Sequence, residues 1–223
     1  MNSSSPRIRC QGILFDMDNT LVSSQGAVER TWTKWAHMRG LDPEFVIRTG
    51  HGCRSLETIA IVAPHLDAVA EAEIVETIEA ADTEGLAMLP GVSELLAALP
   101  PDRWTVVTSA TVPLARARIT AAGIPTPARI VTAECAPLGK PDPGPYLAGA
   151  ALLGFKPQEC VVFEDAPAGV ASGRAAGCAV VATTYSVPAE ELTAAHFLIS
   201  DLNAVAGKVF PDRLELTLTA LAR

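Results

Sequence analysis

The sequence lacks several features by which whole classes of protein are recognised. Its five cysteines are scattered, odd in number and without a C-x-x-C pair. We therefore expect reduced thiols and a cytoplasmic protein rather than a disulfide framework. No apolar run approaches the roughly 20 residues that a membrane-spanning helix needs. The polar first residues also contain no apolar stretch of the kind found in a signal peptide.

Clusters of basic residues are missing as well. The chain has 17 Lys and Arg against 25 Asp and Glu, which gives a formal net charge of −8. This balance argues against a nucleic acid or an anionic membrane as a partner, so a few specific groups must bind any anionic substrate. We also expect a monomer, because no long apolar helix face is evident.

The hydrophobic content is high, at 49% of 223 residues, which is typical of a globular chain of one or two domains. From residue 91 onward, short apolar segments rich in Val and Ile alternate with helical patterns. Such continuous apolar runs are typical of parallel strands covered on both faces. With residues 12–15, they predict a doubly wound, Rossmann-like α/β fold. The expected later strands are residues 104–110, 128–134, 159–166, 178–185 and an edge strand at 196–202, with a short helix at 190–195 before the last.

Residues 23–89 interrupt this alternation and contain only helical patterns. We expect helices at 26–40, 42–50, 55–63 and 67–85, with Asp42 and Asp67 as N-caps. A crossover needs only a dozen or more residues, so this stretch predicts an inserted all-helical cap domain. The α/β core domain would then comprise residues 1–22 and 90–223, with the two connections side by side.

Two carboxylates, Asp16 and Asp18, directly follow the buried-strand pattern "GILF". Ligands of open α/β sheets bind at the carboxyl ends of the strands, so these side chains are candidates for a site. Other polar residues follow the later strands or lie in the loops behind them: Thr108, Ser109, Lys140, Glu164 and Asp165.

Several carboxylates in one small space require a cation, and oxygen ligands without His or Cys favour a hard ion, most simply Mg²⁺. A carboxylate can attack a phosphate ester and form an acyl-phosphate. Lys140 and Ser109 would bind phosphoryl oxygens, while Asp18 would protonate the leaving alcohol and then activate water.

Each of these residues taken alone also has an ordinary structural interpretation. Asp16 and Asp18 fit a turn or a cap, Ser109 and Asp165 fit N-caps of the following helices, and Lys140 fits an exposed turn. The functional interpretation depends on all of them occurring in order at successive strand ends.

The ordered set Asp16-x-Asp18-x-Thr20, Ser109, Lys140-Pro141 and Glu164-Asp165 resembles the haloacid dehalogenase-like (HAD) superfamily over about residues 10–205. The helical insert resembles the cap of that superfamily. Asn19 departs from the pattern, where Gly is commoner, but Asn tolerates similar backbone conformations.

The resemblance implies a role for each matched position. Asp16 is the nucleophile that becomes phosphorylated, and Asp18 is the general acid and base. Ser109 and Lys140 bind the phosphoryl group. The implied Mg²⁺ ligands are Asp16, the backbone carbonyl of Asp18, and Asp165 with Glu164, the last directly or through water.

Within the superfamily, the sequence is most similar to glycerol-3-phosphate and 2-deoxyglucose-6-phosphate phosphatases. This similarity implies a small phosphorylated sugar or polyol as substrate. His51 and Arg54 would face it from the cap, and Thr20 is a further candidate contact.

Two other functions remain open: a phosphoglucomutase-like transferase on the same core, and a binding protein without catalysis. The last segment, residues 213–223, is expected to be a terminal helix or a tail.

Overall fold

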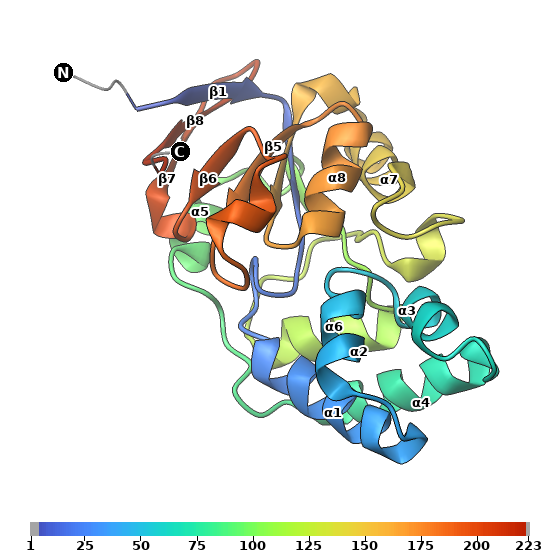
Figure 1. Cartoon of the computed structure of the whole chain (residues 1–223). Coiled ribbons are helices and arrows are strands. Elements are labelled where there is room, and N and C mark those ends of the chain that lie inside the picture. Colours follow the sequence, from blue (N-terminus) through green and yellow to red (C-terminus); the bar gives the residue numbers. More distant parts are fainter. Residues whose placement is uncertain (1–4, 222–223) are drawn as a thin grey trace.

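A five-stranded parallel sheet forms the centre of the computed structural model, which describes residues 5–221 (Figure 1). Its strand order is β3-β2-β4-β5-β6, so the chain winds outward in both directions from β2, as the sequence predicted. The strands are β2 (Gly12–Phe15), β3 (Trp104–Val106), β4 (Cys160–Glu164), β5 (Ala179–Thr183) and β6 (Phe197–Ile199).

Apolar layers cover both faces of this sheet. Ile13 and Phe15 of β2 face one layer, while Leu14 faces the other, because successive side chains of a strand point to opposite sides. The rings of Phe15 and Phe163 stack with centroids 5.2 Å apart. The first layer includes α5 (Val92–Ala98) and α6 (Val112–Ala121), and the second includes α7 (Gly144–Leu153) and α8 (Pro167–Ala175).

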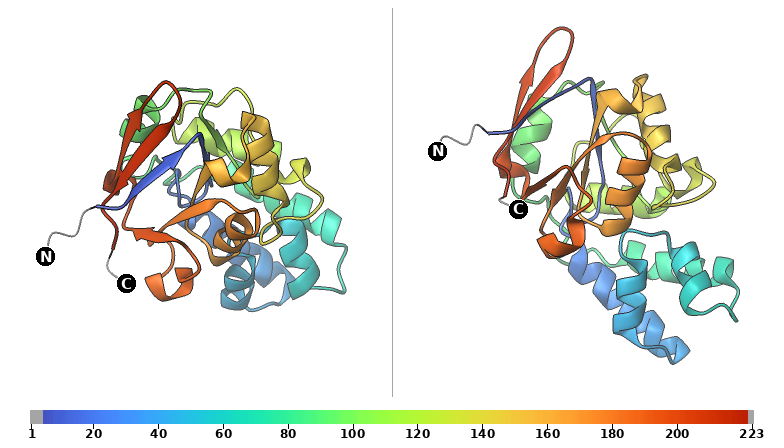
Figure 2. Two further views of the ribbon diagram at one scale, coloured as in Figure 1. Left: turned by 90° about the horizontal axis from the view of Figure 1, so that it is seen from above. Right: turned by 45° about the horizontal axis from the view of Figure 1, so that its top comes forward.

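Four helices follow β2 and gather at one end of the α/β part (Figures 1 and 2). They have an apolar cluster of their own, in which the rings of Trp32 and Trp35 meet edge to face. None of the described helices is long and apolar enough to cross a bilayer. The four are α1 (Gln25–Arg39), α2 (Pro43–Gly50), α3 (Ser55–Val62) and α4 (Ala68–Ala81).

Local signals set the limits of these helices. Asp42 and Asp67 accept hydrogen bonds from backbone N–H groups of the first turns of α2 and α4, as predicted. The two connections to the α/β part also lie side by side as predicted. The N–H of Leu89 donates to the carbonyl of Leu21 at 2.9 Å.

A second, antiparallel sheet differs from the sequence prediction. Residues 213–223 were expected to be a helix or tail, but β8 (Leu214–Leu218) pairs with β1 (Arg7–Cys10) and β7 (Val205–Val209). The segment "LELTL" alternates with period two, and its three leucines are buried against the core. Residues 222–223 lie outside the described part of the chain.

Two other expected elements do not form as a regular strand and helix. The strand expected at 128–134 is a single parallel bridge between Val131 and Val107, followed by a 3₁₀ turn at Ala133–Cys135. The short helix expected at 190–195 is a 3₁₀ turn at Ala189–Leu192. Prolines 125 and 127 precede the bridge, and proline cannot donate to a strand ladder. The remaining 3₁₀ turns are Pro157–Glu159 and Leu202–Ala204.

The buried position of β8 gives a stability test. Leu216 is fully buried in the first apolar layer, whereas Leu221 is 40% exposed. We expect Leu216→Ala to lower the free energy of unfolding by about 2–5 kcal/mol, because it leaves a cavity. Leu221→Ala should change it by less than about 0.5 kcal/mol. Urea unfolding of both variants checks this, and equal effects would contradict the packing described for β8.

Candidate active site

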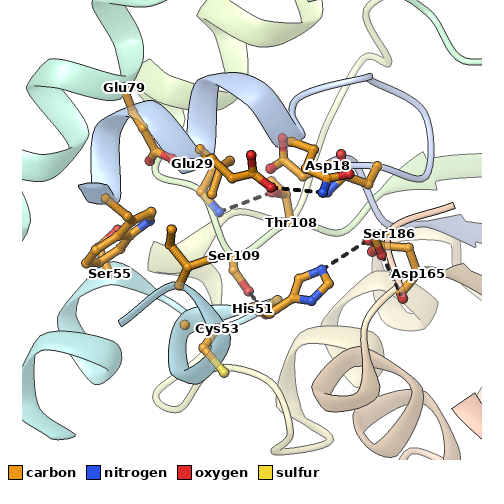
Figure 3. Close-up of a pocket in the computed structure, with 18 of the residues that line it drawn as sticks. Asp18, Glu29, His51, Cys53, Ser55, Glu79, Thr108, Ser109, Asp165 and Ser186 are labelled. Atoms are coloured by element: carbon orange, nitrogen blue, oxygen red, sulfur yellow. Dashed lines mark hydrogen bonds and ion pairs between the residues drawn. The ribbon is translucent and has the colours of Figure 1, made fainter. Parts of the chain in front are cut away.

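The loop after β2 brings the first two candidate carboxylates to the sheet edge. Asn19 has a φ of 57°, a left-handed conformation that Asn adopts more readily than most residues. Its side-chain oxygen accepts a hydrogen bond from the N–H of Ser24 at 3.3 Å. Within this turn, Asp16 and Asp18 both line a cavity between the sheet and the helices α1–α4 (Figure 3).

Lys140 is the central cation of the site. Its ammonium donates to Asp16 at 2.5 Å, to Glu164 at 2.7 Å and to the carbonyl of Val107 at 3.2 Å. The ammonium also lies 5.1 Å from the ring centroid of Tyr146. Lys140 is only 1% exposed, so these partners replace the water that a lysine ordinarily binds. The alternative interpretation of Lys140 as an exposed turn residue is therefore wrong.

Glu164 is held by four donors. One carboxylate oxygen accepts from Lys140 and the Tyr146 hydroxyl, and the other accepts from the backbone N–H groups of Asp165 and Ala166. Gly169 of α8 makes room for it, because a Cβ there would lie 1.6 Å from a Glu164 oxygen. The carboxylate therefore has a fixed position beside the lysine.

Burial sets the proton affinities of these groups. It raises the pKa of Asp16 well above the ordinary range, and the nearby carboxylates Glu164 and Asp165 add to this rise while Lys140 opposes it. Burial likewise raises the pKa of Asp165. For Lys140, burial works against the charge, but Asp16 and Glu164 outweigh it and raise the pKa of the ammonium.

The carboxylates form a group suited to a cation. Asp16, Glu164 and Asp165 each offer an oxygen within 4.8 Å of the others, and all three are buried. One lysine does not balance three carboxylates, and Glu164 and Asp165 add to the rise in the pKa of Asp16 that burial causes. Additional positive charge at this place would keep Asp16 ionised. The residues present therefore fit a hard divalent cation.

Asp18 is held by a charged pair that reaches the helices. Arg118 of α6 donates to Asp18 at 2.6 Å and to Glu79 of α4 at 2.8 Å. Arg118 and Glu79 are 4% and 5% exposed. Burial raises the pKa of Glu79 to about 7, although Arg118 opposes this rise. The buried Oδ1 of Asp18 has no hydrogen-bond partner among the described residues, so one oxygen of this carboxylate is free to act.

The loop before α3 closes the cavity from the other side. His51 Nε2 lies 3.3 Å from an oxygen of Asp165, and the Ser109 hydroxyl donates to the carbonyl of Gly52 at 2.9 Å. Burial opposes the charge of His51, but the hydrogen bond to Asp165 outweighs it and raises the histidine pKa. The structure therefore brings Ser109, His51 and Asp165 together, as Figure 3 shows.

Two candidate substrate contacts lie elsewhere. Thr20 is 1% exposed and is not among the residues lining the cavity, because the turn after β2 directs it into the protein. Arg54 does not line the cavity either. Its guanidinium donates to the carbonyls of Ala136 at 2.8 Å and Pro137 at 3.3 Å. The structure therefore does not place these two side chains at the cavity.

Sequence reasoning missed several residues around the cavity. Arg118 lies in a helix pattern with a second arginine two positions earlier, and Glu79 lies among many acidic residues of α4. Nothing in those patterns marks either as buried. Tyr146 lies in the first turn of α7, directly after the segment "GKPDPGP". A buried tyrosine hydroxyl usually has a hydrogen-bond partner, so the sequence could have indicated this residue as a neighbour of the site.

Known proteins match this chain over most of its length. A family model for the haloacid dehalogenase-like hydrolases matches residues 10–177. The chain is 46% identical over 206 residues to hexitol phosphatase A of Escherichia coli, covering 89% of this chain and 94% of that protein. It is 37% identical over 197 residues to glycerol-1-phosphate phosphohydrolase 2 of Saccharomyces cerevisiae, covering 81% and 78%.

A solved structure supports the fold alone. The β-phosphoglucomutase of Clostridium difficile superposes with a TM-score of 0.75 at 20% identity, covering 87% of this chain and 92% of that one. The family match spans most of the chain and includes Asp16, Asp18, Ser109, Lys140 and Asp165. The resemblance inferred from the sequence is confirmed: the chain belongs to the haloacid dehalogenase-like hydrolase family.

Proposed function

We propose that this protein is a Mg²⁺-dependent phosphatase of a small phosphorylated sugar or polyol, and that Asp16 is its nucleophile. The observation that carries the proposal is the buried ammonium of Lys140 between Asp16 and Glu164. Its partner Asp16 lines the cavity together with Asp18 and Ser109. The phosphatase relatives favour the same substrate class.

In the first step, an oxygen of Asp16 attacks phosphorus and the bond from phosphorus to the leaving oxygen breaks. Asp18 gives its proton to the departing alcohol, and an aspartyl-phosphate remains on Asp16. Lys140 and Ser109 hold phosphoryl oxygens throughout, so the developing charge meets donors that are already in place.

In the second step, Asp18 takes a proton from water. The resulting hydroxide attacks phosphorus, the bond from phosphorus to the Asp16 oxygen breaks, and phosphate leaves. Asp18 is suited to both transfers because Arg118 fixes one of its oxygens while the other has no partner among the described residues.

Asp16 and Asp165 would hold the Mg²⁺, together with the backbone carbonyl of Asp18 and with Glu164 directly or through water. Both Glu164 oxygens already accept two hydrogen bonds each, so we assign this residue mainly to the placement of Lys140. When bound, the ion supplies positive charge that offsets the repulsion between the carboxylate and the phosphate.

We assign residues 23–89 to a cap domain and residues 1–22 and 90–223 to the catalytic core. The cap side of the cavity is lined by apolar and polar groups, including Val28, Glu29, Trp32, Arg48 and His51. These side chains would contact the alcohol part of the substrate, while the core binds the phosphate. A closed cap also keeps bulk water from the acyl-phosphate.

A phosphoryl transferase of the mutase kind would use the same core residues, since it differs only in passing the phosphoryl group to a sugar hydroxyl. We retain this second function as an alternative because the fold is similar to that of a phosphoglucomutase. Hydrolysis is favoured because the relatives at 46% and 37% identity carry phosphatase names.

The first test is phosphate release with Mg²⁺ from glycerol 3-phosphate, mannitol 1-phosphate, 2-deoxyglucose 6-phosphate and glucose 1-phosphate. We expect release by the wild type and at least a thousandfold loss, roughly, in Asp16→Asn, since the nucleophile is gone. Asp212→Asn is the matched control, because that carboxylate is 72% exposed at the surface. Circular dichroism checks that all three proteins are folded.

Retention of most activity by Asp16→Asn would overturn the covalent mechanism. Formation of a sugar-phosphate isomer without phosphate release would replace the phosphatase by the mutase.

The role of Asp18 predicts a dependence on the leaving group. Asp18→Asn should slow the release of an alkyl alcohol by about 10²–10⁴, because that alcohol needs a proton to leave. p-Nitrophenolate needs none, so a rapid first burst of p-nitrophenol should persist in this variant. Stopped-flow absorbance measures the burst, and its loss in step with alkyl phosphate turnover would contradict the acid role.

Metal binding is testable apart from turnover. We expect Mg²⁺ to raise the melting temperature of the wild type, and a concentration 100 times Kd corresponds to about 2.7 kcal/mol. EDTA should reverse the rise, which Asp165→Asn should lack and Asp212→Asn should keep. A melting temperature that does not respond to Mg²⁺ in the wild type would contradict the proposed ion.

A further inference from the structure

The first turn of α3 contacts the loop that carries Lys140. Arg54 precedes this helix and donates to the carbonyls of Ala136 and Pro137. Glu57, one turn later, accepts the N–H of Gly139 at 2.7 Å. The two side chains thus bind three backbone groups of residues 136–139, immediately before Lys140. Arg54 and Glu57 are also paired with each other, at 3.9 Å.

The backbone at Gly139 shows how close this contact is. A Cβ there would lie 2.4 Å from a Glu57 oxygen and 2.9 Å from both Cγ and Nε of Arg54. Gly139 does not have a positive φ, so its backbone conformation places no demand for glycine. Glycine is favoured at this position because the side chains of Arg54 and Glu57 leave no room for a Cβ.

The other side of the same loop is anchored in the α/β part. The N–H of Asp142 donates to the carbonyl of Gly139 at 2.9 Å, and the Ser172 hydroxyl of α8 donates to the carbonyl of Asp142. Lys140 lies between these two anchors and reaches Asp16 with its ammonium. The loop therefore has one fixed side in the core and one side held by the helices.

Charge and geometry both favour a holding role for Arg54 over a substrate contact. Arg54 is 9% exposed and does not line the cavity, and its guanidinium donates to two carbonyls. Hydrogen bonds from a charged group are stronger and more directional than those between neutral groups. Both acceptors are backbone carbonyls of the loop, so these hydrogen bonds form only when the loop has this conformation.

We infer that Arg54 and Glu57 are positioning residues that hold the 136–139 loop and so set the place of Lys140 whenever the helical segment is closed over the site. The inference rests on the proposed phosphoryl-binding role of Lys140. It gives Arg54 a task that does not depend on the alcohol part of the substrate. Opening of the helical segment would release both side chains from the loop, and the lysine would lose one of its supports.

Four variants test this inference. Arg54→Ala and Glu57→Ala remove the contacts from the helical side, and Gly139→Ala displaces them from the loop side. Glu57→Gln keeps an acceptor for the Gly139 N–H and is the conservative variant. Arg116→Ala and Glu73→Gln, which change exposed residues of α6 and α4, are the matched controls.

We expect the first three variants to lower kcat about tenfold or more, by the same factor for every substrate of the panel, with little change in KM. Glu57→Gln should restore most of the activity, and both controls should match the wild type. A substrate contact predicts the opposite pattern for Arg54→Ala: a rise in KM that differs between substrates, with Glu57→Ala and Gly139→Ala harmless. That pattern would overturn the inference.

Hydrogen exchange gives a readout without turnover. In the wild type, the Gly139 amide should be protected, and peptides covering residues 136–142 should exchange faster in Arg54→Ala and Glu57→Ala but not in the controls. Unchanged exchange in both would overturn the inference, whatever the activities are. If the wild type releases no phosphate from any substrate while exchange changes as expected, the proposed function fails and the loop contact stands.

Discussion

The site is organised around one buried ammonium between two carboxylates. Lys140 is an expensive group to bury, and it is stable there only because Asp16 and Glu164 supply charge and the Val107 carbonyl supplies a further acceptor. The same contacts fix Asp16 at the edge of the sheet. Each of these partners comes from a different strand or the loop behind it, so the parallel sheet has to form before the charges balance.

The charges around Lys140 do not cancel completely, and the negative charge that remains suits a bound cation. Three carboxylates share the space with one lysine, which leaves room for a divalent cation. Arg118 lies between Asp18 and Glu79 and so joins the α/β part to the helices through buried charge. The helical segment is thus tied to the site at several independent points rather than by a single hinge contact.

The sequence predicted the parts of this protein that depend on local pattern and order along the chain. The apolar runs gave the parallel sheet, Asp42 and Asp67 marked helix starts, and the strand-end residues met at one edge because parallel strands place them there. It did not predict features that depend on which side chain is buried against which. Arg54 matched a substrate contact in the sequence, but its direction follows from the approach of Gly139, 85 residues later in the chain. The strand β8 was missed although its alternation was readable, because a short terminal segment gives little context for choosing between helix and strand.

The small antiparallel sheet has a consequence for how the chain is made. Strand β1 is synthesised well before its partner β8, because Arg9 and Glu215 on these strands are 206 residues apart along the chain. Loop closure over such a separation is slow compared with the pairing of neighbouring segments. During translation, β1 therefore has no partner strand until β8 has emerged from the ribosome. This layer, which packs Leu214, Leu216 and Leu218 on the core, is completed only after β8 has been synthesised.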